Sequence, residues 1–206
     1  MLVTLTGGAG AGKTTLAAAL AAIVGPERVR VLHGDDYYFA EPGQGGVWAS
    51  DEAGVPRLDV GDPGSVDGAR LAGDVDAALA RARVVVVEGL FARRVAPQRP
   101  CRRFDVFVDL AADLRLVRKI DRKCVGGGFP LEVLLRNYVL HRRAAHERHV
   151  EPLRRGCDLV VDGARAPEML AGQVWAAARG AAASRADGCG AGGRGAGGCG
   201  AAGRDS

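Results

Sequence analysis

The sequence lacks an apolar segment long enough to cross a membrane. The longest uncharged run near its start, TTLAAALAAIVGP, is far shorter than the roughly 20 apolar residues that a bilayer span requires. No basic leader with a small-residue cleavage site precedes the opening MLVTLTGG. We therefore expect no membrane partner and a cytoplasmic location.

Cysteine is also scarce, and its spacing is typical of neither a disulfide framework nor a zinc site. The 206-residue sequence has five cysteines, which form no CxxC pair and no His/Cys metal spacing: Cys101, Cys124, Cys157, Cys189 and Cys199. An odd, scattered set of this kind indicates reduced thiols in a cytosol.

Charge and bulk composition exclude few functions. The net charge of +4 fits anionic small molecules as easily as nucleic acid. A hydrophobic content of 48% and a charged content of 25% are ordinary for a soluble protein. The length suits one α/β domain and is short for two. The sequence leaves a homo-oligomer open.

Short apolar runs alternate with helical patterns along most of the chain. Runs that read as buried strands occupy residues 2–6, 28–33, 84–87, 104–110 and 157–163. Helical patterns follow them at residues 13–24, 65–79, 112–125, 130–149 and 166–179, with Ser65 as the expected N-cap of the second. Because the strands are apolar throughout, they predict an α/β fold over residues 1–179. We expect three layers, with a mostly parallel five-stranded sheet between the helices.

The last segment, residues 180–206, is rich in Gly and Ala and has no large apolar side chain. It cannot bury enough surface to offset its chain entropy, so we predict a disordered tail. One arginine in its GGRGAGG stretch is a weak signal, and we expect no nucleic-acid partner.

A phosphate-binding motif follows the first predicted strand. GGAGAGKT fits the pattern G-x4-G-K-[ST] of a P-loop, with a strand before it and a helix after it. Its backbone N–H groups and the positive end of the helix dipole favour phosphate oxygens. Lys13 would reach the β and γ phosphates, and the Thr14 hydroxyl would bind Mg²⁺. The predicted nucleotide-binding residues are Gly7, Gly8, Ala9, Gly10, Ala11, Gly12, Lys13, Thr14 and Thr15.

A carboxylate follows the VVVV strand at Glu88. The carboxyl end of a parallel strand lies at the ligand-binding edge of such a sheet. Glu88 is therefore predicted to hold the Mg²⁺ shell beside Thr14.

A basic stripe lies on the helix predicted at 112–125. Four basic residues share one helical face: Arg115, Arg118, Lys119 and Arg122. A solvated face is the commoner reason for such a run. The glycines of VGGGF that follow it, however, are typical of a hinge, and a P-loop is present in the same chain. These features favour a lid at about 115–130 that closes over the triphosphate, with Arg115 on the nucleotide and Arg118 and Arg122 stabilising the transferring phosphoryl group.

Several motifs together make the chain resemble the uridine kinase/phosphoribulokinase family of P-loop kinases. They are GGAGAGKTT, the DDYY stretch at 35–38, the VVVVEGLF strand, and the block from DLAADLRLVRKIDRK through HVEP. The resemblance covers about residues 2–163. It implies a P-loop NTPase fold, ATP as phosphate donor, Mg²⁺, and a small hydroxyl-bearing acceptor, with a uridine- or cytidine-type nucleoside first. Nicotinamide riboside, pantothenate and sugar phosphates are the alternatives.

The resemblance also implies site residues. Asp35 would accept or orient the proton of the acceptor hydroxyl, and Tyr38 would form a wall of the acceptor site or pin the loop of Asp35. The segment LDVGDPGSVD resembles the family's substrate segment, which makes Asp59 and Asp62 candidates for ribose hydroxyls.

Two departures from the family pattern affect specificity. Gly127-Gly128 stand where the lid usually has Arg-Gly, so more depends on Arg118 and Arg122. After the Glu-Gly strand, FARRVAPQRP replaces the Tyr and His that contact a pyrimidine. Phe91 and Arg93 would then contact the substrate, and the arginines there suit an anionic one.

A nucleotide-dependent switch is the second hypothesis. A GTPase normally needs an Asn-Lys-x-Asp guanine reader, and the one asparagine, Asn137, stands in RNYV. DEAG at 51–54 matches the Asp-x-x-Gly switch pattern but does not follow a predicted strand. Both observations argue against a switch.

Overall fold

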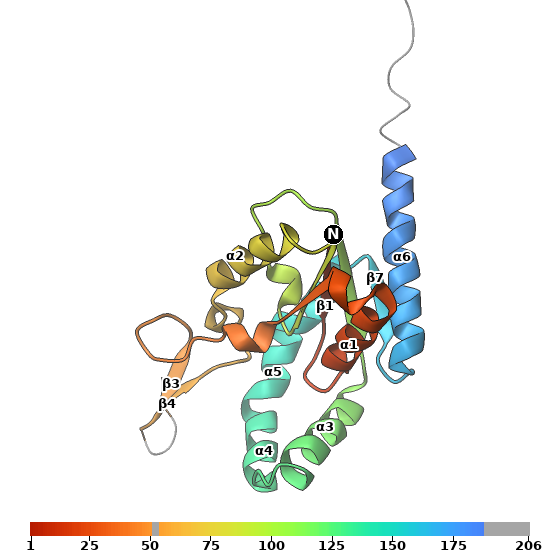
Figure 1. Cartoon of the computed structure of the whole chain (residues 1–206). Helices are drawn as coiled ribbons and strands as arrows, with labels where there is room; N and C mark the ends of the chain where they lie inside the picture. The colour runs from red at the N-terminus through yellow and green to blue at the C-terminus, as the bar shows by residue number, and fades with distance from the viewer. Residues whose placement is uncertain (51–53, 188–206) are drawn as a thin grey trace, which may run out of the picture.

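Five parallel strands form the central sheet of the computed structural model, which describes residues 1–50 and 54–187 (Figure 1). Their spatial order is β2 (Val29–His33), β5 (Val84–Gly89), β1 (Leu2–Thr6), β6 (Arg103–Asp109) and β7 (Leu159–Asp162). Strand order therefore runs in opposite directions on the two sides of β1. A ligand site is expected at the carboxyl edge of such a switch point.

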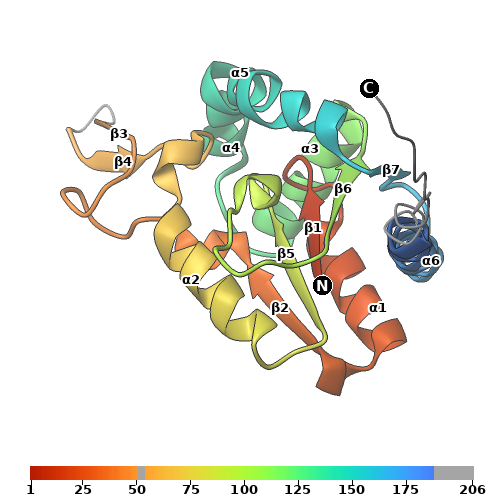
Figure 2. The same cartoon turned by 90° about the horizontal axis from the view of Figure 1, so that it is seen from above.

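Helices cover both faces of the sheet, which confirms the predicted α/β fold (Figure 2). On one face α1 (Lys13–Val24) and α6 (Pro167–Asp187) pack on alternate strand residues, among them Val84 and Val86. On the other face α2 (Gly68–Leu79) packs on the residues between them, Val85 and Val87. Both sides of β5 are therefore apolar, as its continuous valine run predicted.

A helical hairpin, residues 112–150, stands beyond the carboxyl edge of the sheet (Figures 1 and 2). Its first arm is α3 (Ala112–Ile120) with the π-helical turn Asp121–Val125. The second arm contains α4 (Leu131–Asn137), α5 (Arg143–Ala145) and two π-helical turns, Tyr138–Arg142 and His146–Val150. The two predicted helical segments are confirmed, with glycines at the bend.

An antiparallel hairpin projects from the body between β2 and α2, where the sequence predicted no strand (Figure 1). It consists of β3 (Trp48–Ser50) and β4 (Pro56–Leu58). Strands of three residues in a Gly- and Pro-rich segment leave little periodicity to detect. Three residues of the DEAG motif, 51–53, lie outside the described residues.

Two helix ends differ from the prediction. Helix α2 begins at Gly68 rather than after Ser65, because the Asp67 side chain accepts a hydrogen bond from the Arg70 backbone N–H at 2.9 Å. Helix α6 continues to Asp187, past the end expected near residue 179. Residues 188–206, the greater part of the predicted tail, lie outside the described residues.

Candidate functional site

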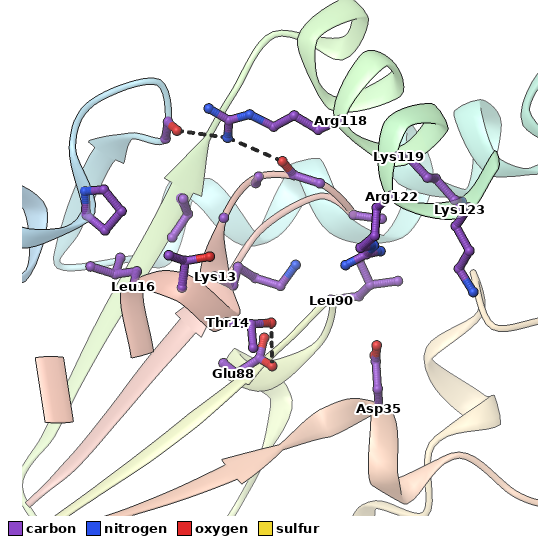
Figure 3. Close-up of a pocket in the computed structure, with 18 of the residues that line it drawn as sticks. Lys13, Thr14, Leu16, Asp35, Glu88, Leu90, Arg118, Lys119, Arg122 and Lys123 are labelled. Atoms are coloured by element: carbon purple, nitrogen blue, oxygen red, sulfur yellow. Dashed lines mark hydrogen bonds between the residues drawn. The ribbon is translucent and has the colours of Figure 1, made fainter. Parts of the chain in front are cut away.

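A cavity of about 850 Å³ opens at the carboxyl edge of the sheet. The loop between β1 and α1 forms its floor, and residues that follow β2, β5 and β7 form its sides. The helical hairpin 112–150 closes it from above (Figure 3). The cavity therefore lies at the switch point of the strand order.

The loop after β1 has the backbone shape of a phosphate cradle. Gly10 and Gly12 have φ of 86° and 96°, a left-handed conformation that favours glycine. A Cβ on Gly10 would lie 2.6 Å from the carbonyl oxygen of Arg115, so no side chain fits there. Residues Ala9 to Leu16 line the cavity, which places most of the predicted nucleotide-binding loop on its floor.

Lys13 is buried at the start of α1, and its Nζ donates to the carbonyl of Gly8 at 3.0 Å. Burial lowers the pKa of the Lys13 ammonium, while the carboxylates of Glu88 and Asp35 raise it. An anion in the cavity would add to the stabilisation of this buried charge.

Thr14 and Glu88 meet beside Lys13. The Thr14 hydroxyl donates to Glu88 Oε1 at 2.9 Å, and the Glu88 side chain is buried. A hydroxyl and a carboxylate are hard oxygen donors of the type that Mg²⁺ takes together with phosphate oxygens. The residue pair that the sequence predicted for Mg²⁺ therefore fits this ion.

The sequence reasoning missed His33. Its Nδ1 lies 2.9 Å from the same Oε1 of Glu88, and the two residues are register partners at the ends of β2 and β5. His33 and Glu88 each stand at the carboxyl end of a predicted strand, which was the available signal. The sequence did not show that these two strands are neighbours, so the contact was not predicted.

Asp35 faces the helical hairpin across the cavity (Figure 3). It lies in the short 3₁₀ helix Gly34–Tyr37, directly after β2. Tyr38 also lines the cavity, and its hydroxyl donates to the Val60 carbonyl at 2.9 Å. Burial and the negative charge of Asp35 raise the pKa of Tyr38. Both residues are thus on the cavity side, as predicted.

The two tyrosines have different surroundings. Tyr37 belongs to the core under α2, and its hydroxyl donates to Asp74 Oδ2 at 2.8 Å. The Arg70 guanidinium lies 4.7 Å from the centre of its ring. Tyr37 therefore anchors the 3₁₀ helix that holds Asp35 and does not contact the cavity.

The residues of the basic stripe differ in whether they line the cavity. Arg118 donates to the carbonyl oxygens of Gly163 at 3.0 Å and Gly10 at 3.5 Å. Arg122 also lines the cavity and lies on the hairpin side of Lys13 (Figure 3). Arg115 does not line it, because its side chain packs on Gly8 and its Nε donates to the Leu110 carbonyl at 2.9 Å. Its contact thus supports the loop from behind.

The structure holds the other four predicted substrate residues away from the cavity lining. Asp59 accepts from Arg142 at 2.7 Å, and Asp62 caps the turn at Gly64. Phe91 is buried in a core cluster with Phe107 and two other apolar side chains. Arg93 Nε donates to the Gly156 carbonyl at 2.9 Å. We therefore assign no substrate contact to Phe91 and Arg93.

The cavity lining also includes polar residues of the hairpin that were not among the predicted site residues. Arg142 and Asn137 come from the second arm of the hairpin, and Lys123 extends the basic stripe by one position. The sequence pattern of the second arm did not indicate which of its polar side chains face the cavity. The choice depends on how the hairpin packs, which is tertiary information.

Comparison with known proteins supplies a family. The sequence profile of the phosphoribulokinase / uridine kinase family matches residues 67–169, half of the chain. Uridine kinase of Chlamydia pneumoniae is 27% identical over 183 residues, covering 79% of this chain and 82% of that protein. Uridine kinase of Deinococcus deserti is 28% identical over 189 residues, covering 78% and 86%.

Solved structures agree on the fold. A gluconokinase from Sinorhizobium meliloti gives a TM-score of 0.55 at 19% identity, covering 90% of this chain and 95% of that one. Shikimate kinase from Acinetobacter baumannii, in complex with shikimate, gives 0.51 at 20% identity, covering 84% and 90%. At such identity the likeness establishes the P-loop α/β fold alone.

Proposed function

Because the chain belongs to the phosphoribulokinase / uridine kinase family and is a P-loop kinase, we propose that it transfers the γ-phosphate of ATP to a hydroxyl group of a small acceptor. One observation carries the proposal. The P-loop lysine, the Thr14–Glu88 pair and Asp35 line a single cavity, with the basic residues of the hairpin opposite them.

Each group has a task in this reaction. The loop and Lys13 bind the phosphates, and Arg118 and Arg122 neutralise charge on the phosphoryl group in transfer. Thr14 and Glu88 would hold Mg²⁺, which neutralises charge on the β and γ phosphate oxygens when bound. Asp35 orients the acceptor hydroxyl and takes its proton, the role that a carboxylate in hydrogen-bond reach performs.

The acceptor is the finer part of the proposal. The relatives are named uridine kinases, so a nucleoside is the first acceptor to test. Nicotinamide riboside, pantothenate and sugar phosphates are the others. The closed hairpin is proposed as a lid that excludes water from the transfer.

An ATP-consumption screen over these four acceptor classes tests the proposal. We expect one class to stimulate turnover, and Asp35→Asn to lower kcat on it by roughly 10²–10⁴, the range for a general base. Asp36→Asn is the matched control, because Asp36 is exposed beside Asp35 and does not line the cavity. If no acceptor raises turnover, or if Asp35→Asn keeps full activity, the assignment fails.

A further inference from the structure

Five basic residues of the helical hairpin line the cavity. Arg118 is bound to the carbonyls of Gly10 and Gly163, at the end formed by the loop after β7. Arg122 lies between the hairpin and Lys13 (Figure 3). Lys119 and Lys123 line the cavity as well, and Lys123 reaches down on the side where Asp35 lies (Figure 3).

Arg142 adds a third cation on this side. It comes from the second arm of the hairpin, and its Nη1 lies 2.7 Å from Asp59 Oδ1. Arg142 lines the cavity whereas Asp59 does not. The Asp59 carboxylate fixes the guanidinium through an ion pair whose side chains are 29% and 39% exposed. The side chain that lines the cavity is thus the cation of the pair, and Asp59 offsets part of its charge.

Among the residues that the structure describes, the acidic side chains in the cavity lining are fewer than the basic ones. The lining contains two carboxylates, Glu88 and Asp35. Glu88 is bonded to Thr14 and His33 at the floor, which leaves Asp35 on the acceptor side. Lys119, Lys123 and the Asp59-paired Arg142 therefore line the cavity on this side, and Asp35 is the carboxylate of the lining there.

The closeness of these cations affects the pKa of Lys119. Burial lowers the pKa of Lys119, and the positive charges of Arg142, Lys123 and Arg122 lower it further. Cations that repel one another in a cavity are stabilised by a bound anion. The proposed function places the phosphates of ATP along the loop and Lys13, so we assign an anion beside Asp35 to the second ligand.

We propose that the acceptor carries an anionic group, a phosphate or a carboxylate, in addition to the hydroxyl that is phosphorylated. Lys123 and Arg142, with Lys119 beside them, bind this group. The inference rests on the proposed kinase function and narrows its acceptor, placing neutral nucleosides below anionic hydroxyl compounds.

The transfer itself keeps its chemistry. The acceptor oxygen forms a bond to the γ-phosphorus, and the bond from that phosphorus to the bridging oxygen breaks. ADP leaves with the electron pair, and the hydroxyl proton passes to Asp35. The anionic group fixes the acceptor so that its hydroxyl lies at Asp35.

Matched acceptors with and without a charge test the inference. The pairs are ribose 5-phosphate with ribose, pantothenate with panthenol, and gluconate with glucose, and uridine is run beside them. We expect kcat/KM to favour the charged member of the active pair by on the order of 10- to 100-fold, as for a hydrogen bond to a charged group. The phosphate and carboxylate pairs distinguish the two sources of charge.

Variants locate the anion site. Lys123→Met and Arg142→Met should each raise KM for the anionic acceptor about tenfold and leave KM for ATP nearly unchanged. Lys123 is exposed, so its loss does not endanger the fold. Arg142→Lys should recover part of the effect. Arg143→Met is the control, because Arg143 is exposed and paired with Glu147 on the same helix.

The outcomes distinguish an error in the acceptor class from an error in the kinase function. If neutral acceptors are used as well as charged ones, or if the variants change KM for ATP and not for the acceptor, the anionic acceptor is wrong and the kinase function stands. If no acceptor of any class is phosphorylated, both are wrong.

Discussion

Glu88 receives contacts from three directions at the end of β5. Thr14 and His33 bond to one of its oxygens at 2.9 Å, and its charge raises the pKa of the buried Lys13. A carboxylate fixed in this way presents its other oxygen in a constant direction. The proposed role of Glu88 in Mg²⁺ binding therefore depends on these neighbours, among which the side chain of His33 is 45% exposed.

Replacing His33 tests this dependence. His33→Leu removes the contact to Glu88, and we expect kcat/KM to fall about tenfold at limiting Mg²⁺, since a hydrogen bond to a charged group is lost. His33→Asn keeps a donor near the Nδ1 position and should retain most of the activity. Titration of Mn²⁺ binding provides a second measurement, and His141→Leu, an exposed histidine, is the control. Equal activity of the Leu and Asn variants would argue against a positioning role.

Tyr37 gives the fold a pH dependence. Burial, followed by the hydrogen bond to Asp74, raises its pKa to about 12 from an ordinary value of 10.0. The unfolded chain ionises first, so this contribution to stability is complete below pH 10 and is lost as the pH rises to about 12.

Urea unfolding of Tyr37→Phe at pH 8 and pH 11 checks this sign. At pH 8 the variant should be less stable by about 1 kcal/mol, the usual worth of a hydrogen bond. Between the two pH values it should lose less stability than the wild type. Tyr138→Phe removes a phenol elsewhere and serves as the control. A variant whose stability falls as steeply as that of the wild type contradicts the assignment.

At the level of elements, one buried cluster fixes the turn after β5. Asp105 on β6 accepts from Thr4 at 2.6 Å and from Arg103 at 2.8 Å. Arg103 also donates to the Val95 carbonyl at 2.6 Å and to the Arg93 carbonyl. The turn that carries Phe91 and Arg93 is therefore held by two strands of the sheet.

Removing Arg103 should loosen this turn. We expect Arg103→Met to lower the free energy of unfolding by about 2 kcal/mol, because it leaves the buried Asp105 without its main partner. Arg102→Met changes an exposed neighbour and should have little effect. Chemical denaturation measures both. A loss under 0.5 kcal/mol, roughly the size of an ordinary surface substitution, would contradict this account.

The elements also show what the sequence could predict. Local sequence patterns predicted the strands, the phosphate-binding loop and the Thr14–Glu88 pair. The loop and the pair could be predicted because both lie at strand ends beside the glycine-rich segment. Phe91 and Arg93 were expected at the substrate because they stand where the family resemblance implies pyrimidine-contacting residues. The chain instead turns into the 3₁₀ helix Ala92–Arg94, and Phe91 enters the core. Arg142 and Asp59 lie 83 positions apart, so only the folded chain brings them together.

On the scale of the whole molecule, α6 forms the outer layer of one core. Leu170, Val174 and Ala178 are buried against α1 and the sheet. Leu170 also lines the cavity, so the site and the core share the first part of this helix. Among the residues described, no helix combines the length and apolar character needed to cross a bilayer.

Truncations test how far the functional unit extends. A chain ending at Asp187 should keep its melting temperature and kcat/KM, since every cavity and core residue named above precedes that point. A chain ending at Gly172 loses Val174 and Ala178 and should be less stable by about 2–4 kcal/mol. Calorimetry and kinetics compare the two. Loss of activity in the longer chain would extend the functional unit into residues 188–206.

Gly163, which follows β7, brings a late part of the sequence into the cavity lining. A Cβ there would collide with the Ala11 carbonyl, and the Gly163 carbonyl accepts from Arg118. During synthesis, Gly163 is added about 150 residues after the phosphate-binding loop. At ordinary rates of synthesis the delay is on the order of 10 s. The contacts of Gly163 with the loop and with Arg118 therefore form only after most of the chain has been synthesised.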